Sequence, residues 1–228
     1  MKRLSLLLIM FALSLCSMAQ DCNKKCDSDS CCDVVRVACI GNSITEGFGL
    51  AFPSSQSWPA VLQQMLGERF DVKNCGISAR TLLNSGDLPY TKEKQWNDAK
   101  SFLPDIVIVK LCTNDSKPWN WKHKDEFLRD YQLMIDTLKA LSSHPCIYLC
   151  TPIHSENVEW GIRDSVITKE IAPLVRLLVC RNKLKLIDLN ILFPNDQKLL
   201  LDDGVHPNVD GSKRLAEIIY HEVKRKNL

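Results

Sequence analysis

The sequence predicts an α/β fold, a three-layer α/β/α sandwich built on a five-stranded parallel sheet. Two observations favour this fold. From Val34 onward, short runs rich in β-branched residues alternate with longer amphipathic stretches. Three of the short runs, around Val37, Val107 and Ile147, are almost continuously apolar, as strands buried on both faces should be. The alternation implies right-handed crossovers and helices on both faces of the sheet.

The predicted elements follow in order along the chain. Strands are expected at residues 35–40, 70–75, 105–111, 145–150 and 183–189. Apolar residues at helical spacing predict helices over residues 58–66, 127–141, 162–178 and 215–223. In such a sheet, ligand sites form in the loops beyond the carboxyl ends of the strands. The segments around Ser43, Gly76, Asn114 and His206 lie in those loops or just after them.

Residues 1–19 have the organisation of a secretory signal peptide. A basic start is followed by an apolar run over residues 4–15 and by small residues ahead of a cleavage site after Ala19. The apolar run is too short to span about 30 Å of hydrocarbon. The prediction is therefore a secreted or periplasmic protein. Lipid attachment at Cys16 is the alternative, which the bulky Leu15 disfavours.

The rest of the chain divides into a cysteine-rich leader, residues 20–33, and one folded domain, residues 34–228. The leader is polar and lacks apolar periodicity, which is typical of a flexible segment. Local disulfides in one of three pairings, or a zinc site of unusual spacing, are the alternatives for Cys22, Cys26, Cys31 and Cys32. Six further cysteines sit inside apolar runs and are expected to be buried thiols: Cys39, Cys75, Cys112, Cys146, Cys150 and Cys180.

The charge balance argues against two classes of partner. Cleavage after Ala19 removes two of the 29 basic residues and none of the 27 acidic ones, which leaves a net charge of zero. No basic face remains to attract nucleic acid or anionic lipid. We therefore expect no nucleic-acid partner and no stable membrane insertion after the signal is removed.

Two distant segments carry the residue types of a serine esterase. Ser43 follows the first strand, and Asp203 precedes His206 by three residues. A carboxylate at this spacing can orient the imidazole, which then serves as general base for a serine that the fold brings near. Asp202 is the alternative carboxylate. Taken alone, a serine at a strand-to-helix turn is more often a helix N-cap.

Gly76 and Asn114 extend this pattern, because they end the second and third predicted strands. Together with the N–H of Ser43, the N–H of Gly76 and the side-chain amide of Asn114 would form an oxyanion hole with three donors. Each residue also has a simpler interpretation by itself, as a turn glycine and as an Asx turn.

These segments together resemble the sequence blocks of the SGNH hydrolase family, also called GDSL-type esterases. Gly-Asn-Ser-Ile-Thr resembles the first block, Asn-Cys-Gly-Ile-Ser the second, Cys-Thr-Asn-Asp the third and Asp-Gly-Val-His-Pro-Asn the last. The resemblance runs from about Val35 to the C-terminus. It implies the flavodoxin-like SGNH hydrolase fold, an acyl-enzyme mechanism, and no metal or organic cofactor. It also implies a catalytic triad of Ser43, His206 and Asp203. The oxyanion hole it implies is formed by Ser43, Gly76 and Asn114.

Two positions depart from the family pattern. Asn42 stands where an aspartate usually precedes the nucleophile, and Cys112 stands where a glycine usually opens the third block. Neither position carries proton transfer, so the triad is expected to stand. Cys112 is expected to narrow the cleft or to change how Asn114 is presented.

The stretch from Cys112 to Pro118 resembles one found in secreted carbohydrate esterases, including sialate O-acetylesterases. The resemblance implies removal of a short acyl group, most simply acetyl, from a glycan. No long apolar lid is visible, and exposed aromatic rings suit the apolar faces of sugars. The candidate substrate contacts are Arg80, Lys117, Trp119, Trp121, His154 and Trp160.

Three other functions stay open at this point. A lysophospholipase or thioesterase of the same family would share the triad but line its acyl groove with apolar residues. A flavodoxin-like phosphate-binding protein would use the loop from Ser43 to Gly47, but it leaves Asp203 and His206 unexplained. A non-catalytic glycan-binding protein would hold the triad residues out of alignment.

Overall fold

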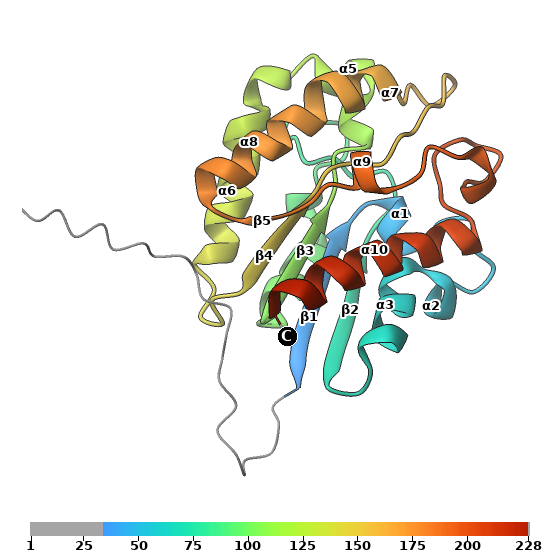
Figure 1. Ribbon diagram of the computed structural model, residues 1–228. Coiled ribbons are helices and arrows are strands. Elements are labelled where there is room, and N and C mark those ends of the chain that lie inside the picture. Colours follow the sequence, from blue (N-terminus) through green and yellow to red (C-terminus); the bar gives the residue numbers. More distant parts are fainter. Residues whose placement is uncertain (1–33, 228) are drawn as a thin grey trace, which may run out of the picture.

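In the computed structural model of the protein, a parallel sheet lies between two layers of helices (Figure 1). The structure describes residues 34–227, and side chains up to residue 224. The predicted signal peptide and cysteine-rich leader, residues 1–19 and 20–33, lie outside the described residues. The predicted α/β/α fold class is confirmed.

The sheet contains the five expected strands in the order β2-β1-β3-β4-β5. The last strand is shorter than predicted, because Lys183 ends the preceding helix in the left-handed conformation, with φ 54°, and Leu189 already begins the next helix. The bounds are β1 Val35–Gly41, β2 Phe70–Gly76, β3 Ile106–Lys110, β4 Cys146–Cys150 and β5 Lys185–Ile187.

Within residues 34–227, five longer helices cover the sheet, and shorter helical segments connect them. The longer helices are α3 Trp58–Leu66, α4 Lys94–Ser101, α6 Phe127–Lys139, α8 Ala172–Asn182 and α10 Val209–Asn227. The short α-helices are α1 Ser43–Glu46, α2 Pro53–Gln56, α5 Pro118–Trp121, α7 Asp164–Val166 and α9 Leu189–Leu192. The remaining turns are η1 Tyr90–Lys92, η2 Asn114–Ser116, η3 Lys124–Glu126, η4 Ile167–Ile171 and η5 Gln197–Leu199.

The helices differ from the prediction in two places. The helix expected over residues 162–178 is divided into α7, the π-helical turn η4 and α8. Helix α4 was not predicted, because only Trp96 and Ala99 of its eight residues are buried and its sequence is mostly polar.

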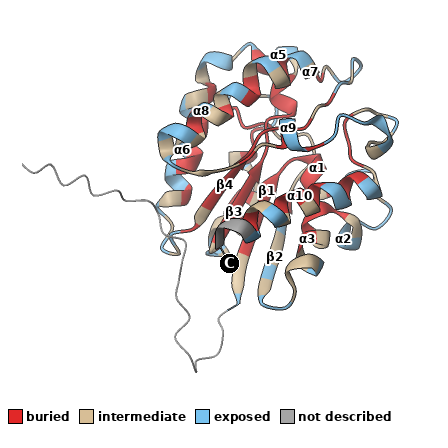
Figure 2. Cartoon of the chain, in the orientation of Figure 1, coloured by how far each residue is buried: buried red, intermediate tan, exposed pale blue. Residues whose placement is uncertain are grey.

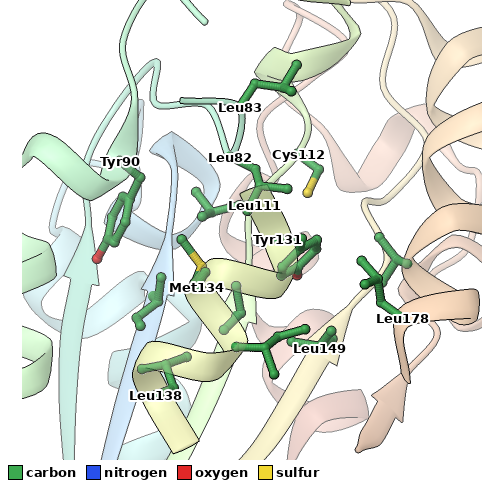
Figure 3. Packing of buried hydrophobic residues seen from close by; sticks show 14 of the residues in the cluster. Leu82, Leu83, Tyr90, Leu111, Cys112, Tyr131, Met134, Leu138, Leu149 and Leu178 are labelled. Carbon is green, nitrogen blue, oxygen red and sulfur yellow. The ribbon is translucent and has the colours of Figure 1, made fainter. Parts of the chain in front are cut away.

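Each face of the sheet has its own hydrophobic core. Helices α4, α6 and α8 pack on one face, where Tyr131, Met134 and Leu138 meet Leu149 and Leu178 (Figure 3). Helices α3 and α10 cover the other face, so the central strands β1, β3 and β4 are buried over most of their length, whereas the edge strand β2 is mostly half-buried or exposed (Figure 2). Within residues 34–227, no helix combines the length and apolar character needed to cross a membrane.

The cysteines follow the prediction in part. Cys39, Cys75, Cys112 and Cys150 are buried, and Cys146 is half-buried. The expectation of a buried thiol is wrong for Cys180, which is exposed on α8 because its side chain lies outside the stripe that packs on the sheet.

Candidate active site

Ser43 lies at a tight turn between β1 and α1. Gly41 ends the strand, and a Cβ there would lie 2.0 Å from the Thr45 hydroxyl oxygen, so the turn has no room for a larger residue. Asn42 is the helix N-cap, because its Oδ1 accepts a hydrogen bond of 3.2 Å from the N–H of Ile44. The N-cap interpretation of Ser43 is therefore wrong, and its hydroxyl is not used for capping.

The structure brings Ser43, His206 and Asp203 together. The Nε2 atom of His206 lies 2.7 Å from Oγ of Ser43, and its Nδ1 lies 2.8 Å from Oδ2 of Asp203. The other carboxylate oxygen of Asp203 accepts the N–H groups of Val205 and His206, at 2.8 and 2.9 Å. Gly204, with φ 69°, makes this tight turn possible. Asp202, the alternative carboxylate, is exposed.

The surroundings set the charges of the imidazole and the carboxylate. Burial lowers the pKa of His206 below its usual value, and the carboxylate of Asp203 opposes this only in part. Burial of Asp203 would raise its pKa, but hydrogen bonds from His206 and Val205 outweigh it and hold the pKa below the usual range. At neutral pH the pair is therefore a neutral imidazole beside a carboxylate, which suits a general base.

Asn114 is held at the end of β3 with its amide oriented. Its Nδ2 donates one hydrogen to the carbonyl of Arg80 at 3.1 Å, which directs the second hydrogen elsewhere. The carbonyl of Asn114 accepts a hydrogen bond of 2.9 Å from the side chain of Asn120. The neighbouring Asp115 is buried and accepts the N–H groups of Leu82 and Leu83. The loops that follow β2 and β3 are thus fixed to each other.

The expected role of Gly76 as an oxyanion donor is wrong. Its N–H donates to Oδ1 of Asn74 at 2.9 Å, so the amide is not free. Gly76 instead provides space, because a Cβ there would lie 2.2 Å from the backbone nitrogen of Glu46. A glycine at the end of β2 therefore allows α1 to pack closely against the strand.

Ala79 is a residue that the sequence did not single out. It has a φ of 65°, the left-handed conformation that costs a residue with a Cβ about 1 kcal/mol or more. Within residues 34–227, neither its N–H nor that of Ser43 donates to a protein acceptor. Ala79 directly precedes Arg80, whose carbonyl binds the amide of Asn114. A left-handed residue beside the Asn114 contact is a signal that only the backbone angles reveal.

The two departures from the family pattern have different outcomes. Asn42 caps α1 through its oxygen, as an aspartate would, while its Nδ2 is buried without a partner in the described chain. Cys112 is fully buried in the hydrophobic core, so its side chain does not reach the surface (Figure 3). It takes the left-handed conformation, with φ 79°, in the loop that leads to Asn114.

Aromatic rings border the imidazole. The Trp160 ring, 40% exposed, lies 5.7 Å from the His206 ring, and the Phe48 ring, 47% exposed, lies 4.6 Å from it. Phe48 was missed in the sequence, because a single aromatic residue after a short turn carries no periodic signal. Exposed rings beside a candidate catalytic base are suited to contacts with a substrate.

Trp119 and Trp121 differ, although both were expected near the cleft. Trp119 is 45% exposed, and its Nε1 donates to Asp87 at 2.8 Å. Its ring packs on Gly161, where a Cβ would lie 2.9 Å from two ring carbons. The expectation is wrong for Trp121, which is 6% exposed, packs against Phe127 in the core and donates to Glu170.

The remaining candidate contacts are charged or polar groups with partners of their own. Arg80 pairs with Glu93 at 2.9 Å and also donates to the carbonyl of Ser78. The ammonium of Lys117 lies 5.7 Å from the centre of the Trp119 ring. His154 lies 3.0 Å from the carboxylate of Asp164, the first residue of α7. Among the described side chains, no group of three or more histidine, cysteine or acidic residues is arranged to hold a metal ion.

Known proteins resemble this chain in sequence. A model of the GDSL-like lipase/acylhydrolase family matches residues 39–214. An acetylxylan esterase of Xylanibacter ruminicola is 46% identical over 209 residues, which cover 84% of this chain but only 44% of that enzyme. The chain therefore spans less than half the length of this curated relative.

Solved structures share the fold. The M. smegmatis aryl esterase has a TM-score of 0.69 at 21% identity, and the match covers 84% of this chain and 99% of that chain. A carbohydrate acetylesterase of Sinorhizobium meliloti has a TM-score of 0.67 at 20% identity, with the same coverage of 84% and 99%. At these identities the likeness concerns the fold alone, and it confirms the expected SGNH hydrolase architecture.

Proposed function

The chain belongs to the GDSL-like lipase/acylhydrolase family and is a carboxylic ester hydrolase, and from this premise we propose that it removes acetyl groups from an O-acetylated carbohydrate. The hydrogen-bonded series Ser43–His206–Asp203, beside exposed aromatic rings, is the observation that carries the proposal. It disfavours a non-catalytic glycan-binding protein, in which these residues would be out of alignment.

The first half of the reaction uses Ser43 as nucleophile. His206 takes the proton from Oγ at 2.7 Å while Oγ attacks the carbonyl carbon of the ester. The hydrogen bond between Nδ1 of His206 and Asp203 keeps the imidazole in the tautomer whose Nε2 can accept this proton. The carboxylate of Asp203 also stabilises the imidazolium that forms. His206 then protonates the departing sugar hydroxyl, which leaves an acetyl group on Ser43.

The oxyanion of the tetrahedral intermediate needs donors on one side of Ser43. We assign this role to the N–H of Ser43, the second amide hydrogen of Asn114 and the N–H of Ala79, which takes the place expected for Gly76. One donor of this kind typically contributes about 3–4 kcal/mol to transition-state stabilisation. Water activated by His206 then releases acetate through the same steps in reverse order.

The choice of a neutral sugar rests on the surroundings of Arg80. A sialic acid carries a carboxylate, and two of the candidate substrate contacts are positively charged, Lys117 and the guanidinium of Arg80. The ion pair with Glu93 already neutralises this guanidinium, so it offers little to a second carboxylate. The acetylxylan esterase relative also supports a neutral glycan. Acetylated xylo-oligosaccharides are therefore the first substrates to test.

A direct comparison of substrates tests the proposal. Acetate release is measured from acetylated xylo-oligosaccharides and from O-acetylated sialic acid, and aryl esters from acetate to palmitate report on acyl length. We expect the xylo-oligosaccharides to be the better glycan, and rates to fall steeply from acetate to butyrate, since each methylene without space costs about 1–3 kcal/mol. Rates that rise with chain length would favour the lysophospholipase or thioesterase alternative. Faster release of acetate from O-acetylated sialic acid would contradict the proposal that the substrate is a neutral sugar.

We also propose that the protein is exported, with residues 1–19 removed as a signal peptide. N-terminal sequencing of the protein recovered from outside the cytoplasm should begin at Gln20. An intact N-terminus, or a mature chain that begins at a lipidated Cys16, would contradict this.

A further inference from the structure

A short hairpin after β4, residues 157–162, carries Trp160 to the site. Asn157 and Ile162 pair through two backbone hydrogen bonds of 3.1 and 2.9 Å, and Gly161 donates to Val158 at 3.1 Å. Gly161 takes φ 70°, which lets the chain reverse in so few residues. The reversal leaves the Trp160 ring beside the imidazole of His206.

Both polar atoms of the Asn157 side chain are used, and they connect two separate parts of the site. The Oδ1 atom accepts the N–H of Trp160 at 2.8 Å. The Nδ2 atom donates to the backbone carbonyl of Asp203 at 3.0 Å. One amide thus links the residue that borders His206 to the residue that orients it.

A second contact holds the hairpin against the same turn. The N–H of Glu156 donates to the carbonyl of Gly204 at 3.2 Å. The carbonyl oxygen of Glu156 lies 2.7 Å from where a Cβ on Gly204 would be, so the two backbones pack directly. Among the described residues, the side chain of Asn157 provides the other polar bridge between the hairpin and the Asp203 turn, and a mutation can remove it.

We propose that Asn157 is a positioning residue that fixes Trp160 relative to His206, and so shapes the cleft for the carbohydrate part of the substrate. This rests on the proposed function for the identity of the substrate. These contacts connect four residues in a ring. Asn157 binds the N–H of Trp160, and the Trp160 ring lies beside His206. His206 pairs with the carboxylate of Asp203, and the backbone carbonyl of Asp203 accepts a hydrogen bond from Asn157. A shift of the hairpin therefore changes the aromatic border and the support of the imidazole together.

Comparison of two substitutions separates the effects of the two hydrogen bonds. Asn157→Ala removes both of them. Asn157→Asp keeps an acceptor for the N–H of Trp160, but it loses the donor and places a carboxylate against the Asp203 carbonyl. Glu159→Ala is the matched control, because Glu159 is exposed in the same hairpin and makes none of these contacts. Thermal melting checks that each variant is folded.

The kinetic constants carry the test. For an acetylated xylo-oligosaccharide, we expect Asn157→Ala to raise KM about fivefold to tenfold, the effect of about one lost hydrogen bond at the wall of the cleft. The KM for a small aryl acetate should stay near the parent value. Asn157→Asp should lower kcat on both substrates while changing the KM for the glycan much less. Glu159→Ala should match the parent.

A double-mutant comparison shows whether Asn157 acts through Trp160. In a Trp160→Ala background, adding Asn157→Ala should leave the KM for the glycan unchanged, because the ring that Asn157 positions is absent. An Asn157→Ala effect on this KM that persists undiminished in the Trp160→Ala background would overturn the proposal. So would parent kinetics in both Asn157 variants.

A spectroscopic measurement keeps this test independent of the substrate. Acrylamide should quench tryptophan fluorescence more strongly in Asn157→Ala than in the parent, and the difference should vanish in a Trp160→Phe background. If the parent cleaves aryl acetates but no acetylated glycan, the proposed function fails, while this quenching difference still decides the role of Asn157. Equal quenching in the parent and in Asn157→Ala would refute it.

Discussion

The Nε2 atom of His206 lies 2.7 Å from the hydroxyl oxygen of Ser43, although 163 positions separate the two residues in the chain. The short turn after β1 presents the serine, while the segment ahead of α10 presents the histidine at the same edge of the sheet. Because both segments are braced by backbone hydrogen bonds, the geometry exists before substrate arrives, which is the arrangement an efficient general base requires.

The first prediction concerns the carboxylate of the series. Asp203→Asn should lower kcat on the order of 10⁴-fold, because an amide at this position favours the wrong imidazole tautomer. Asp202→Asn is the matched control, since Asp202 is the exposed neighbour, and it should keep nearly full activity. Steady-state kinetics on an aryl acetate compare the two variants. A large loss in Asp202→Asn with little loss in Asp203→Asn would reverse the assignment.

The second prediction is a pH profile. The neutral form of His206 is the active base, and burial lowers its pKa, with a further lowering from the charge of Lys110. A lower pKa keeps the base neutral at more acidic pH, so the acid limb of kcat/KM should have its midpoint below about 6.5, the usual histidine value. A midpoint above that value would contradict the burial argument. In Asp203→Asn the residual activity should shift to still lower pH.

The sequence predicts the strands well because their signal is local. A run such as residues 106–109 is apolar on both faces wherever it lies, and both faces are buried in the sheet. The end of the fifth strand was not predictable in this way. The position of this strand depends on where α8 ends. Lys183 ends α8 in a left-handed conformation, which a lysine in the sequence does not predict.

The site shows the same division between local and non-local causes. Ser43, Asp203 and His206 were found because their spacing and residue types carry the chemistry. The use of the Gly76 N–H could not be foreseen, since it depends on the rotamer of Asn74, and the freedom of the Ala79 N–H depends on a backbone angle. Sequence proximity could not tell that Trp121 faces the core.

The third prediction uses the two tryptophans of α5 as a pair. Trp121→Ala should destabilise the protein by about 3–5 kcal/mol, because it removes a large buried side chain. Trp119→Ala should leave the melting temperature close to the parent value, since its ring is 45% exposed against 6% for Trp121. Trp119→Ala should instead raise KM for an acetylated xylo-oligosaccharide and not for an aryl acetate. Unchanged glycan kinetics would remove Trp119 from the substrate cleft.

The fourth prediction concerns Lys110, which is fully buried at the end of β3, with its Nζ 3.5 Å from the Thr113 hydroxyl. Burial lowers its pKa to about 7. The unfolded chain keeps the lysine proton up to about pH 10.4, so it binds more protons than the folded protein between these two values. The stability that depends on Lys110 therefore rises with pH across this window and is lowest below about pH 7.

Replacement of this lysine tests the argument. Lys110→Met keeps most of the side-chain volume and removes the charge, so it should stabilise the protein more at about pH 6 than at about pH 10. Urea denaturation of parent and variant at both pH values gives the difference in the free energy of unfolding. If Lys110→Met raises the free energy of unfolding equally at both pH values, or more at the higher one, Lys110 keeps its proton in the folded protein.

The nucleophile is the centre of the proposed mechanism, and covalent labelling tests it most directly. A phosphonate ester that reacts with activated serines is incubated with the protein, and peptide mass spectrometry locates the modification. The predicted result is stoichiometric labelling of Ser43 together with loss of acetate release, no labelling in Ser43→Ala, and much slower labelling in His206→Ala. Labelling of a different residue, or substantial acetate release by Ser43→Ala, would contradict the assignment of Ser43 as nucleophile.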